Sequence, residues 1–225
     1  MTQVTGDFEK AVKESSKVLS IRGRVLPSTL EKVTLVAEHR DGRVTEGEAQ
    51  IPKTGSPIKK IFIRPQTASA APDAIKAIRE AELIILGPGS LYTSIIPNLL
   101  IREIRDTIIE AQVTKIYVCN IMTQPGETDH FKASDHVKEL TLHTHSKILD
   151  ACIVNVGKIP VPMLEKYARE NSFPVEADSV TIRDFGYSVI EEDLVSATDL
   201  IRHDANKLAR IVANLLNLEK RAGRR

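Results

Sequence analysis

Residues 83–100 read LIILGPGSLYTSIIPNLL, and this stretch decides the fold class. It begins with a short apolar run and passes at once into two glycines, a proline and three hydroxyl side chains. Continuous apolar runs are typical of strands buried on both faces of a parallel sheet, and glycines after such a strand let the backbone approach a ligand closely. The stretch therefore predicts a buried strand that ends in a binding loop.

The same alternation of apolar strands and amphipathic helices continues on both sides of this stretch. It predicts an α/β fold with a mainly parallel sheet, helices on both faces and an inserted β-hairpin, joined at Asp41-Gly42. Strands are expected at 59–65, 83–86, 115–119 and 151–155, helices at 7–21, 72–81, 96–112, 133–145, 161–171 and 204–216, and the hairpin at about 31–52, with its strands within 33–51.

Length and composition restrict the class of protein. The 225 residues carry 31 basic and 30 acidic side chains, a formal net charge of +1, which gives no electrostatic argument for nucleic acid or an anionic membrane. No apolar stretch approaches the roughly 20 residues of a bilayer span, and no signal peptide is evident, so we expect a cytoplasmic protein. Cys119 and Cys152 lie in apolar runs and are expected to be buried thiols.

The loop after residues 83–86 has the chemistry of a phosphate cradle. Gly87 and Gly89 permit positive φ, Pro88 stiffens the turn, and Ser90 and Thr93 offer hydroxyl groups near a helix start. The loop lacks the lysine of a Walker motif and the spacing of GxGxxG. A strand-to-helix turn with capping hydroxyls is the alternative.

A second polar loop follows the strand at 115–119. Asn120, Thr123 and Gln124 could contact a nucleobase or sugar, and Glu127 with Asp129 could hold Mg²⁺, which prefers carboxylate oxygens. The alternative is a Pro-Gly turn with solvated acids.

The C-terminal third offers further candidates. Arg202 could bind phosphate through two parallel hydrogen bonds, or it could be buried in a salt bridge with an acid such as Asp199 or Glu191. His203 beside Asp204 is either an acid/base pair or a helix start capped by Asp204. Tyr167 lies within a predicted helix, where a half-buried core position is the ordinary interpretation.

Several motifs together resemble one protein family. They are RGRVLPSTLEKVTLVAEHRDG, LGPGSLYTSIIPNLL, YVCNIMTQPGETD, ASDHV and RHDANKLA. The chain closely resembles, over essentially its whole length, the gluconeogenesis factors of the YvcK type, which are similar to the 2-phospho-L-lactate transferase (CofD) superfamily. The resemblance implies a Rossmann-like fold and a cytoplasmic bacterial protein needed for cell shape and wall synthesis during gluconeogenic growth. It also implies a UDP-sugar ligand such as UDP-N-acetylglucosamine, and cell-wall synthesis proteins as partners.

Carried over by position, the resemblance implies nucleotide binding at Gly87, Pro88, Gly89 and Ser90, a polar wall at Asn120 with the MTQPGETD loop, and ligand contacts near Tyr167 and Arg202. The transferase relatives move a phospholactyl group from a guanosine diphosphate carrier with divalent metal help. A metal-dependent transferase acting on a nucleotide diphosphate donor, with Mg²⁺ as cofactor, is therefore the alternative function, and whether the chain is an enzyme stays open.

The sequence departs from the family pattern at its start. Family members carry a GGGTG turn and a further helical stretch before the equivalent of TGDF, which here begins at Thr5. We therefore expect a single CofD-like domain over residues 1–225 that is incomplete at its N-terminus. A missing strand would leave apolar surface uncovered, so we also expect a homo-oligomer.

Overall fold

The centre of the fold is a four-stranded parallel sheet. The structure is a computed structural model that describes residues 23–197 and 200–222, so the helix predicted at 7–21 lies outside the described residues. The sheet has the order β4-β5-β6-β7, and its strands are β4 (Ile84–Leu86), β5 (Lys115–Val118), β6 (Ala151–Asn155) and β7 (Ser188–Glu192). All neighbours pair in parallel. The three predicted central strands are therefore confirmed in one sheet, and β7 was not predicted.

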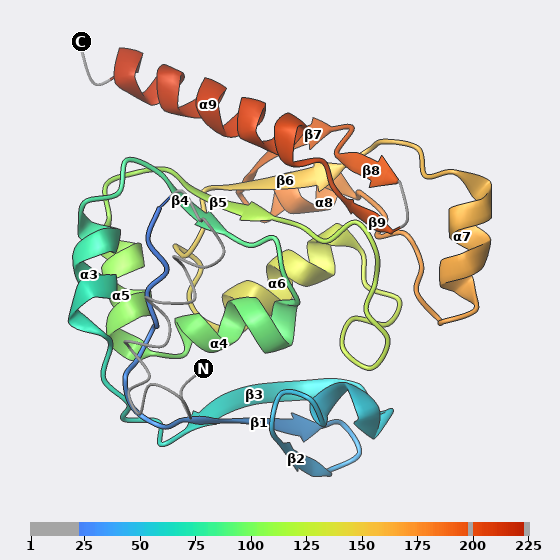
Figure 1. Ribbon diagram of the computed structural model, residues 1–225, viewed down its shortest axis with the longest axis horizontal. Coiled ribbons are helices and arrows are strands. Elements are labelled where there is room, and N and C mark those ends of the chain that lie inside the picture. The colour runs from blue at the N-terminus through green and yellow to red at the C-terminus, as the bar shows by residue number, and fades with distance from the viewer. Residues whose placement is uncertain (1–22, 198–199, 223–225) are drawn as a thin grey trace.

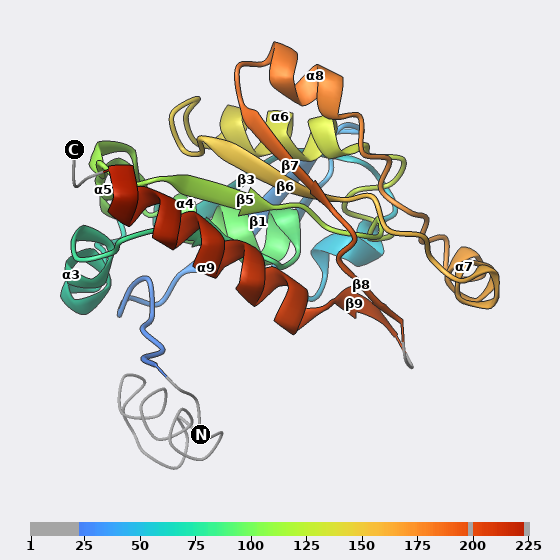
Figure 2. The same cartoon turned by 90° about the horizontal axis from the view of Figure 1, so that it is seen from above.

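Helices cover both faces of this sheet, as predicted. Of the helices that the structure describes, α9 (Ala205–Ala222) lies across one face, and a layer of shorter helices lies on the other (Figures 1 and 2). That layer contains α3 (Pro72–Arg79), α4 (Ile96–Leu99), α5 (Arg102–Glu110), α6 (Ala133–His143) and α8 (Ser179–Asp184). The arrangement is α/β and Rossmann-like.

Successive side chains of β5 divide between the two faces, as the pleat of a strand requires. Ile116 and Val118 belong to the apolar cluster beneath α9, whereas Tyr117 belongs to the cluster beneath α6. All three are fully buried. Cys119 and Cys152 are also buried and free, which confirms the prediction of buried thiols.

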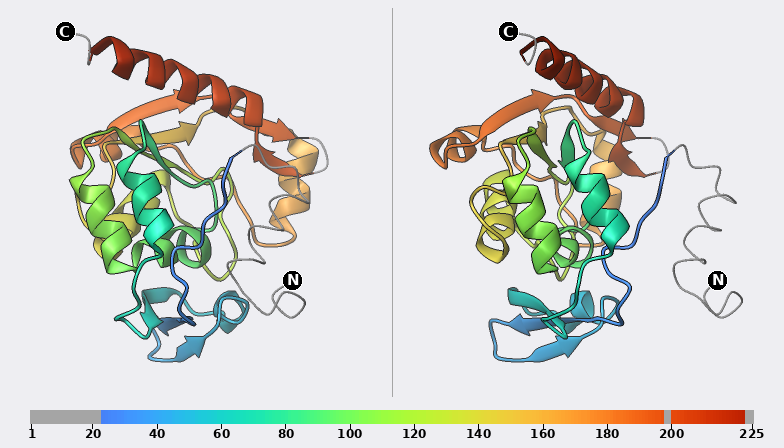
Figure 3. Two further views of the ribbon diagram at one scale, coloured as in Figure 1. Left: turned by 60° about the vertical axis from the view of Figure 1, so that its left-hand side comes forward. Right: turned by 90° about the vertical axis from the view of Figure 1, so that its left-hand side faces the viewer.

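The predicted hairpin lies in a separate antiparallel sheet of order β2-β1-β3. β1 (Thr34–His39) pairs with β2 (Val44–Glu46) and with β3 (Ile58–Arg64). Pairing of β1 with β2 ends at Glu46, and the chain then forms the 3₁₀ turn η1 (Ile51–Thr54), so the hairpin is shorter than predicted. Figure 3 shows this sheet at the opposite end of the molecule from α9, beyond the layer of short helices.

The single helix predicted at 96–112 is wrong. The chain makes a π-type turn, η2 (Leu91–Ile95), then α4, and leaves helical geometry at Ile101 (φ −70°, ψ 110°) before α5 begins. This break lets the chain change direction while Leu99 and Ile101 both remain buried, at 3% and 2% exposure. Apolar spacing alone does not reveal such a change of direction.

The C-terminal part adds elements that the sequence did not predict. Besides α8 and β7, an antiparallel pair joins β8 (Val195–Ala197) to β9 (Ile201–His203). Helix α7 (Val161–Ala168), which was predicted, has no fully buried side chain and projects from the body of the fold, although Met163 and Tyr167 are partly buried (Figures 1 and 2). In the described part of the chain, no helix has the length and apolar character needed to cross a bilayer.

Candidate functional site

A cleft of about 760 Å³ opens where the chain leaves β4 and β5. Ligand sites of α/β sheets lie at the carboxyl ends of the strands, and this volume falls within the range of about 300 to 1,000 Å³ that small-molecule sites occupy. Among its lining residues are most of those predicted from the sequence: Pro88, Gly89, Ser90, Asn120, Thr123, Gln124, Glu127, Tyr167 and Arg202. The structure thus brings together two loops, helix α7 and strand β9, which are far apart in the sequence.

The loop after β4 depends on Gly87, which does not itself line the cleft. Its φ is +93°, and a Cβ there would lie 3.0 Å from Ile95 Cδ1 and 3.2 Å from the carbonyl oxygen of Val118. The glycine therefore lets the loop turn tightly over the end of β5. The turn places Pro88, Gly89 and Ser90 against the cleft.

The side chain of Ser90 does not cap the turn that follows it. Its backbone carbonyl accepts the N–H groups of Ser94 and Ile95, but its hydroxyl oxygen instead accepts a hydrogen bond of 2.6 Å from Gln124 Nε2. Gln124 Oε1 in turn accepts one of 3.1 Å from Asn120 Nδ2. Ser90, Gln124 and Asn120 thus form one polar chain across the two loops. Among the described atoms, Asn120 Oδ1 is buried and has no hydrogen-bond partner.

Thr123 serves the framework of the cleft. Its hydroxyl oxygen accepts the N–H of Phe173 at 2.9 Å, and its own N–H donates to the carbonyl of Phe173 at 2.7 Å. Ser172 Oγ also donates to the carbonyl of Thr123, at 2.6 Å. These bonds fasten the loop after β5 to the segment that follows α7.

Gly126 determines how that loop meets η1. Its φ is +79°, and a Cβ would lie 1.9 Å from the carbonyl oxygen of Pro52. No side chain fits there, so the loop packs directly against the backbone of η1. Pro52 becomes part of the cleft wall as a result.

Glu127 is the buried carboxyl group of the cleft. It is 7% exposed, and the Thr93 hydroxyl lies 3.1 and 3.2 Å from its two carboxylate oxygens. Burial raises the pKa of Glu127, and the hydrogen bond from Thr93 offsets part of that rise. Thr93, a predicted ligand residue, touches the cleft only through this carboxylate and lines another cavity.

Asp129, the other predicted Mg²⁺ ligand, is exposed and does not line the cleft. Its carboxylate accepts the N–H of Gly126 at 2.8 Å. The two carboxylates therefore have separate partners and do not converge in the cleft. Within residues 23–197 and 200–222, no group of three His, Cys, Asp or Glu side chains is placed to share a metal ion.

The third side of the cleft comes from α7 and β9. The Tyr167 hydroxyl accepts the N–H of Ile201 at 3.0 Å, which links the two elements. Arg202 is exposed and makes no ion pair with any described residue. Glu191, a conceivable partner, pairs with Arg183 instead, at 3.0 Å. Arg202 is the cationic side chain of the cleft that is free to meet a ligand.

His203 also lines the cleft. Its Nε2 donates to the carbonyl of Cys119 at 3.0 Å, and burial lowers its pKa, so the ring is neutral at pH 7. Asp204 instead accepts the N–H groups of Asn206 and Lys207 at 2.9 and 3.0 Å, as a helix cap does. The structure therefore shows a helix start capped by Asp204, and not an acid/base pair of His203 with Asp204.

Sequence reasoning missed Pro52 and Glu170, which line the cleft as well. Neither belongs to a loop at the end of a parallel strand, and no sequence spacing relates them to the other residues.

Comparisons with known proteins show what the chain is similar to. The family model for 2-phospho-L-lactate transferase CofD matches residues 1–195. A gluconeogenesis factor of Bacillus subtilis is 48% identical over 217 residues, which cover 96% of this chain and 68% of that protein. A solved structure of a UPF0052 family member from Bacillus halodurans has a TM-score of 0.89 and 39% identity, and the match covers 94% of this chain and 69% of that one.

The chain is shorter than the relatives that it matches. It spans 68% of the Bacillus subtilis protein, and 49% and 47% of relatives from Clostridium acetobutylicum and Nostoc. The matches nevertheless extend over nearly all of this chain, in sequence and in structure. The chain therefore belongs to the CofD family and, within it, to the gluconeogenesis factors.

Proposed function

We propose that the chain is a nucleotide-sugar-binding regulatory protein of the cytoplasm that acts in cell-wall synthesis and cell shape during gluconeogenic growth. Its ligand would be a UDP-sugar such as UDP-N-acetylglucosamine. The observation that carries the proposal is the single cleft in which the loops after β4 and β5 meet Tyr167 and Arg202.

The chemistry of the cleft suits such a ligand. Arg202 has no ion-pair partner within the described residues, and a guanidinium pairs well with a diphosphate. The chain of Ser90, Gln124 and Asn120 offers hydroxyl and amide groups, which suit the polar edges of a base or a sugar. Tyr167 adds an aromatic ring to the wall.

Two observations favour binding over transfer. The carboxylate of Glu127 faces Thr93, and Asp129 faces the backbone of Gly126, so the proposed Mg²⁺ pair is not assembled in the cleft. The alternative is a metal-dependent transferase that uses a nucleotide diphosphate donor, and the match to a transferase family supports it. Magnesium at Glu127 and Asp129 stays a prediction.

Calorimetric titration with UDP-N-acetylglucosamine, in EDTA and again in MgCl₂, tests the proposal. We expect saturable binding under both conditions, with the ligand recovered unchanged by phosphorus NMR. Binding only with Mg²⁺, together with loss of the diphosphate signal when an acceptor is present, would favour the transferase. Absence of binding under both conditions would contradict the proposal.

A further inference from the structure

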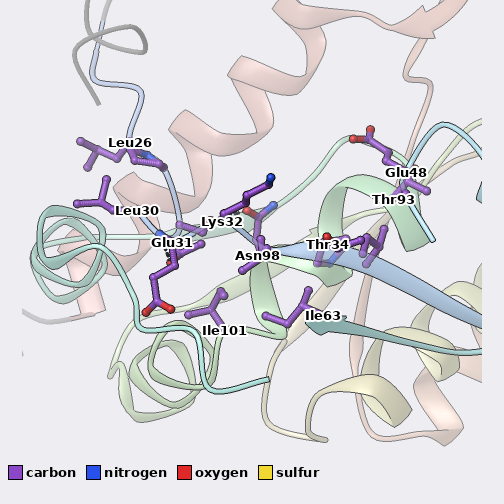
Figure 4. A pocket seen from close by; sticks show the side chains of 17 residues that line it. Leu26, Leu30, Glu31, Lys32, Thr34, Glu48, Ile63, Thr93, Asn98 and Ile101 are labelled. Atoms are coloured by element: carbon purple, nitrogen blue, oxygen red, sulfur yellow. Dashed lines mark hydrogen bonds between the residues drawn. The ribbon is translucent and has the colours of Figure 1, made fainter. Parts of the chain in front are cut away.

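A second cavity, of about 850 Å³, lies beside the cleft and shares none of its lining residues. It is an open space bordered by the segment that leads into β1, by the turn after β2, by the end of β3 and by the chain from η2 to α5 (Figure 4). The hydrogen bond between Thr93 and Glu127 joins the walls of the two spaces, because Thr93 lines the cavity and Glu127 lines the cleft. The cavity is a separate space with its own chemistry.

About half of the lining residues are apolar. They come from three separate parts of the chain and are Leu26, Pro27, Leu30, Val33, Leu35, Ile63, Pro97 and Ile101. Ile63 and Ile101, labelled in Figure 4, belong to the same buried apolar cluster, and they are 4% and 2% exposed. A buried aliphatic floor beneath an open space suits the apolar body of a ligand.

The charged groups of the cavity have different surroundings. Glu31 accepts the backbone N–H of Ser69 at 2.7 Å. Glu48 lies at the end of the cavity near Thr93 (Figure 4), and its charge helps to raise the pKa of Glu127, so this end carries a negative field. Lys32 makes no hydrogen bond or ion pair within the described part of the chain. It is the cationic lining residue, and it is available to a ligand.

We propose that this cavity binds an amphipathic organic anion, whose aliphatic or aromatic body packs on Ile63 and Ile101 and whose acidic group pairs with Lys32. The negative field at the Glu48 end disfavours the acid there, so the acid is directed to Lys32. The inference does not depend on what the cleft binds, because no lining residue is common to the two spaces.

The test uses anilinonaphthalene sulfonate, which combines aromatic rings with one anionic group. We expect one saturable site by fluorescence titration and by calorimetry. Lys32→Glu should weaken binding by at least about tenfold, since it replaces attraction by repulsion. Leu30→Asp should weaken probe binding to a similar extent, because Leu30 lines the cavity. Leu30 is 51% exposed, so we expect this variant to keep its fold.

Matched controls are Lys138→Glu and Leu142→Asp on α6, both exposed and outside the cavity. They should leave probe binding unchanged, and all four variants should keep the melting temperature of the parent chain. Binding without saturation, equal effects of cavity and control variants, or no binding to the folded chain would overturn the proposal. The same samples are also titrated with UDP-N-acetylglucosamine. This second titration tests the proposed function of the cleft separately from the proposed ligand of the cavity.

Discussion

The hydroxyl of Thr93 lies 3.1 and 3.2 Å from the two carboxylate oxygens of Glu127, and this contact joins the walls of two cavities. One turn of chain after β4 therefore serves both spaces, since Ser90 at its start lines the cleft and Thr93 lines the second cavity. A substitution at this contact should therefore affect both the cleft and the second cavity.

Glu127→Gln tests the burial of the carboxyl group. Burial raises the pKa of Glu127 above its unfolded value, so between these two values the folded state binds more protons and the free energy of unfolding falls as pH rises. The amide does not ionise. We expect the variant to gain stability relative to the parent chain as pH rises above the unfolded-state pKa of about 4.3, measured by urea unfolding over a pH series.

Glu170→Gln is the control, because Glu170 also lines the cleft but is exposed. Its stability relative to the parent chain should not change with pH. If the stability of Glu127→Gln relative to the parent chain is also independent of pH, the carboxyl group of Glu127 is not buried.

Thr93→Val removes the donor and keeps the shape of the side chain. The Glu127 carboxylate then loses a hydrogen bond in a buried place, which costs about 1 to 3 kcal/mol. We expect unfolding at pH 7 to show that loss, and Thr93→Ser to restore most of it. In a double-mutant cycle with Glu127→Ala, which removes the acceptor, the two effects should not add. Additive effects would show that the contact contributes nothing to stability.

Gly126→Ala tests the approach of the loop to η1. A methyl group there would meet the Pro52 carbonyl oxygen at 1.9 Å, in addition to the strain of φ +79°, so we expect a loss of at least about 2 kcal/mol. Gly42→Ala is the matched control, because its φ is +86° but no atom lies within 4 Å of the added Cβ. It should cost only about 1 kcal/mol. Equal losses would mean that the contact with Pro52 is unimportant.

Three parallel strands could be predicted because each has a continuous apolar run. β5 and β6 are buried on both faces, as in the run KIYVCNI at 115–121, whereas β4 has an apolar run although Ile85 is 38% exposed. β7 lacks such a run, since its sequence is SVIEE and its two glutamates are exposed. The break at Ile101 was missed for a different reason: both α4 and α5 have helical spacing, and only tertiary packing interrupts them.

The sequence predicted which residues line the site better than it predicted the contacts among them. Loops at the ends of neighbouring parallel strands must lie together, so Ser90 and Gln124 could be placed on one edge. Whether Glu127 faced solvent or the interior could not be read from the sequence, because GETD is typical of an exposed turn. Its burial accompanies the contact of Gly126 with Pro52, which lies more than seventy residues before it in the chain.

Arg202 was expected either to contact a ligand or to lie in a buried ion pair with Asp199 or Glu191. Asp199 lies outside the described residues. Glu191 is paired with Arg183, and Arg202 is exposed in β9, opposite Ser196 of β8. The structure therefore assigns Arg202 no ion pair among the described residues, and its removal should leave the fold intact.

We predict that Arg202→Ala weakens binding of UDP-N-acetylglucosamine by at least roughly tenfold, because a charge-assisted contact to phosphate is lost. Arg202→Lys should recover only part of the affinity, since an ammonium group has the charge without the planar fork. The melting temperature without ligand should change little for either variant. Arg210→Ala, an exposed change on α9 outside the cleft, should alter neither quantity. Unchanged affinity of a folded Arg202→Ala chain, measured by calorimetry, would remove Arg202 from the site.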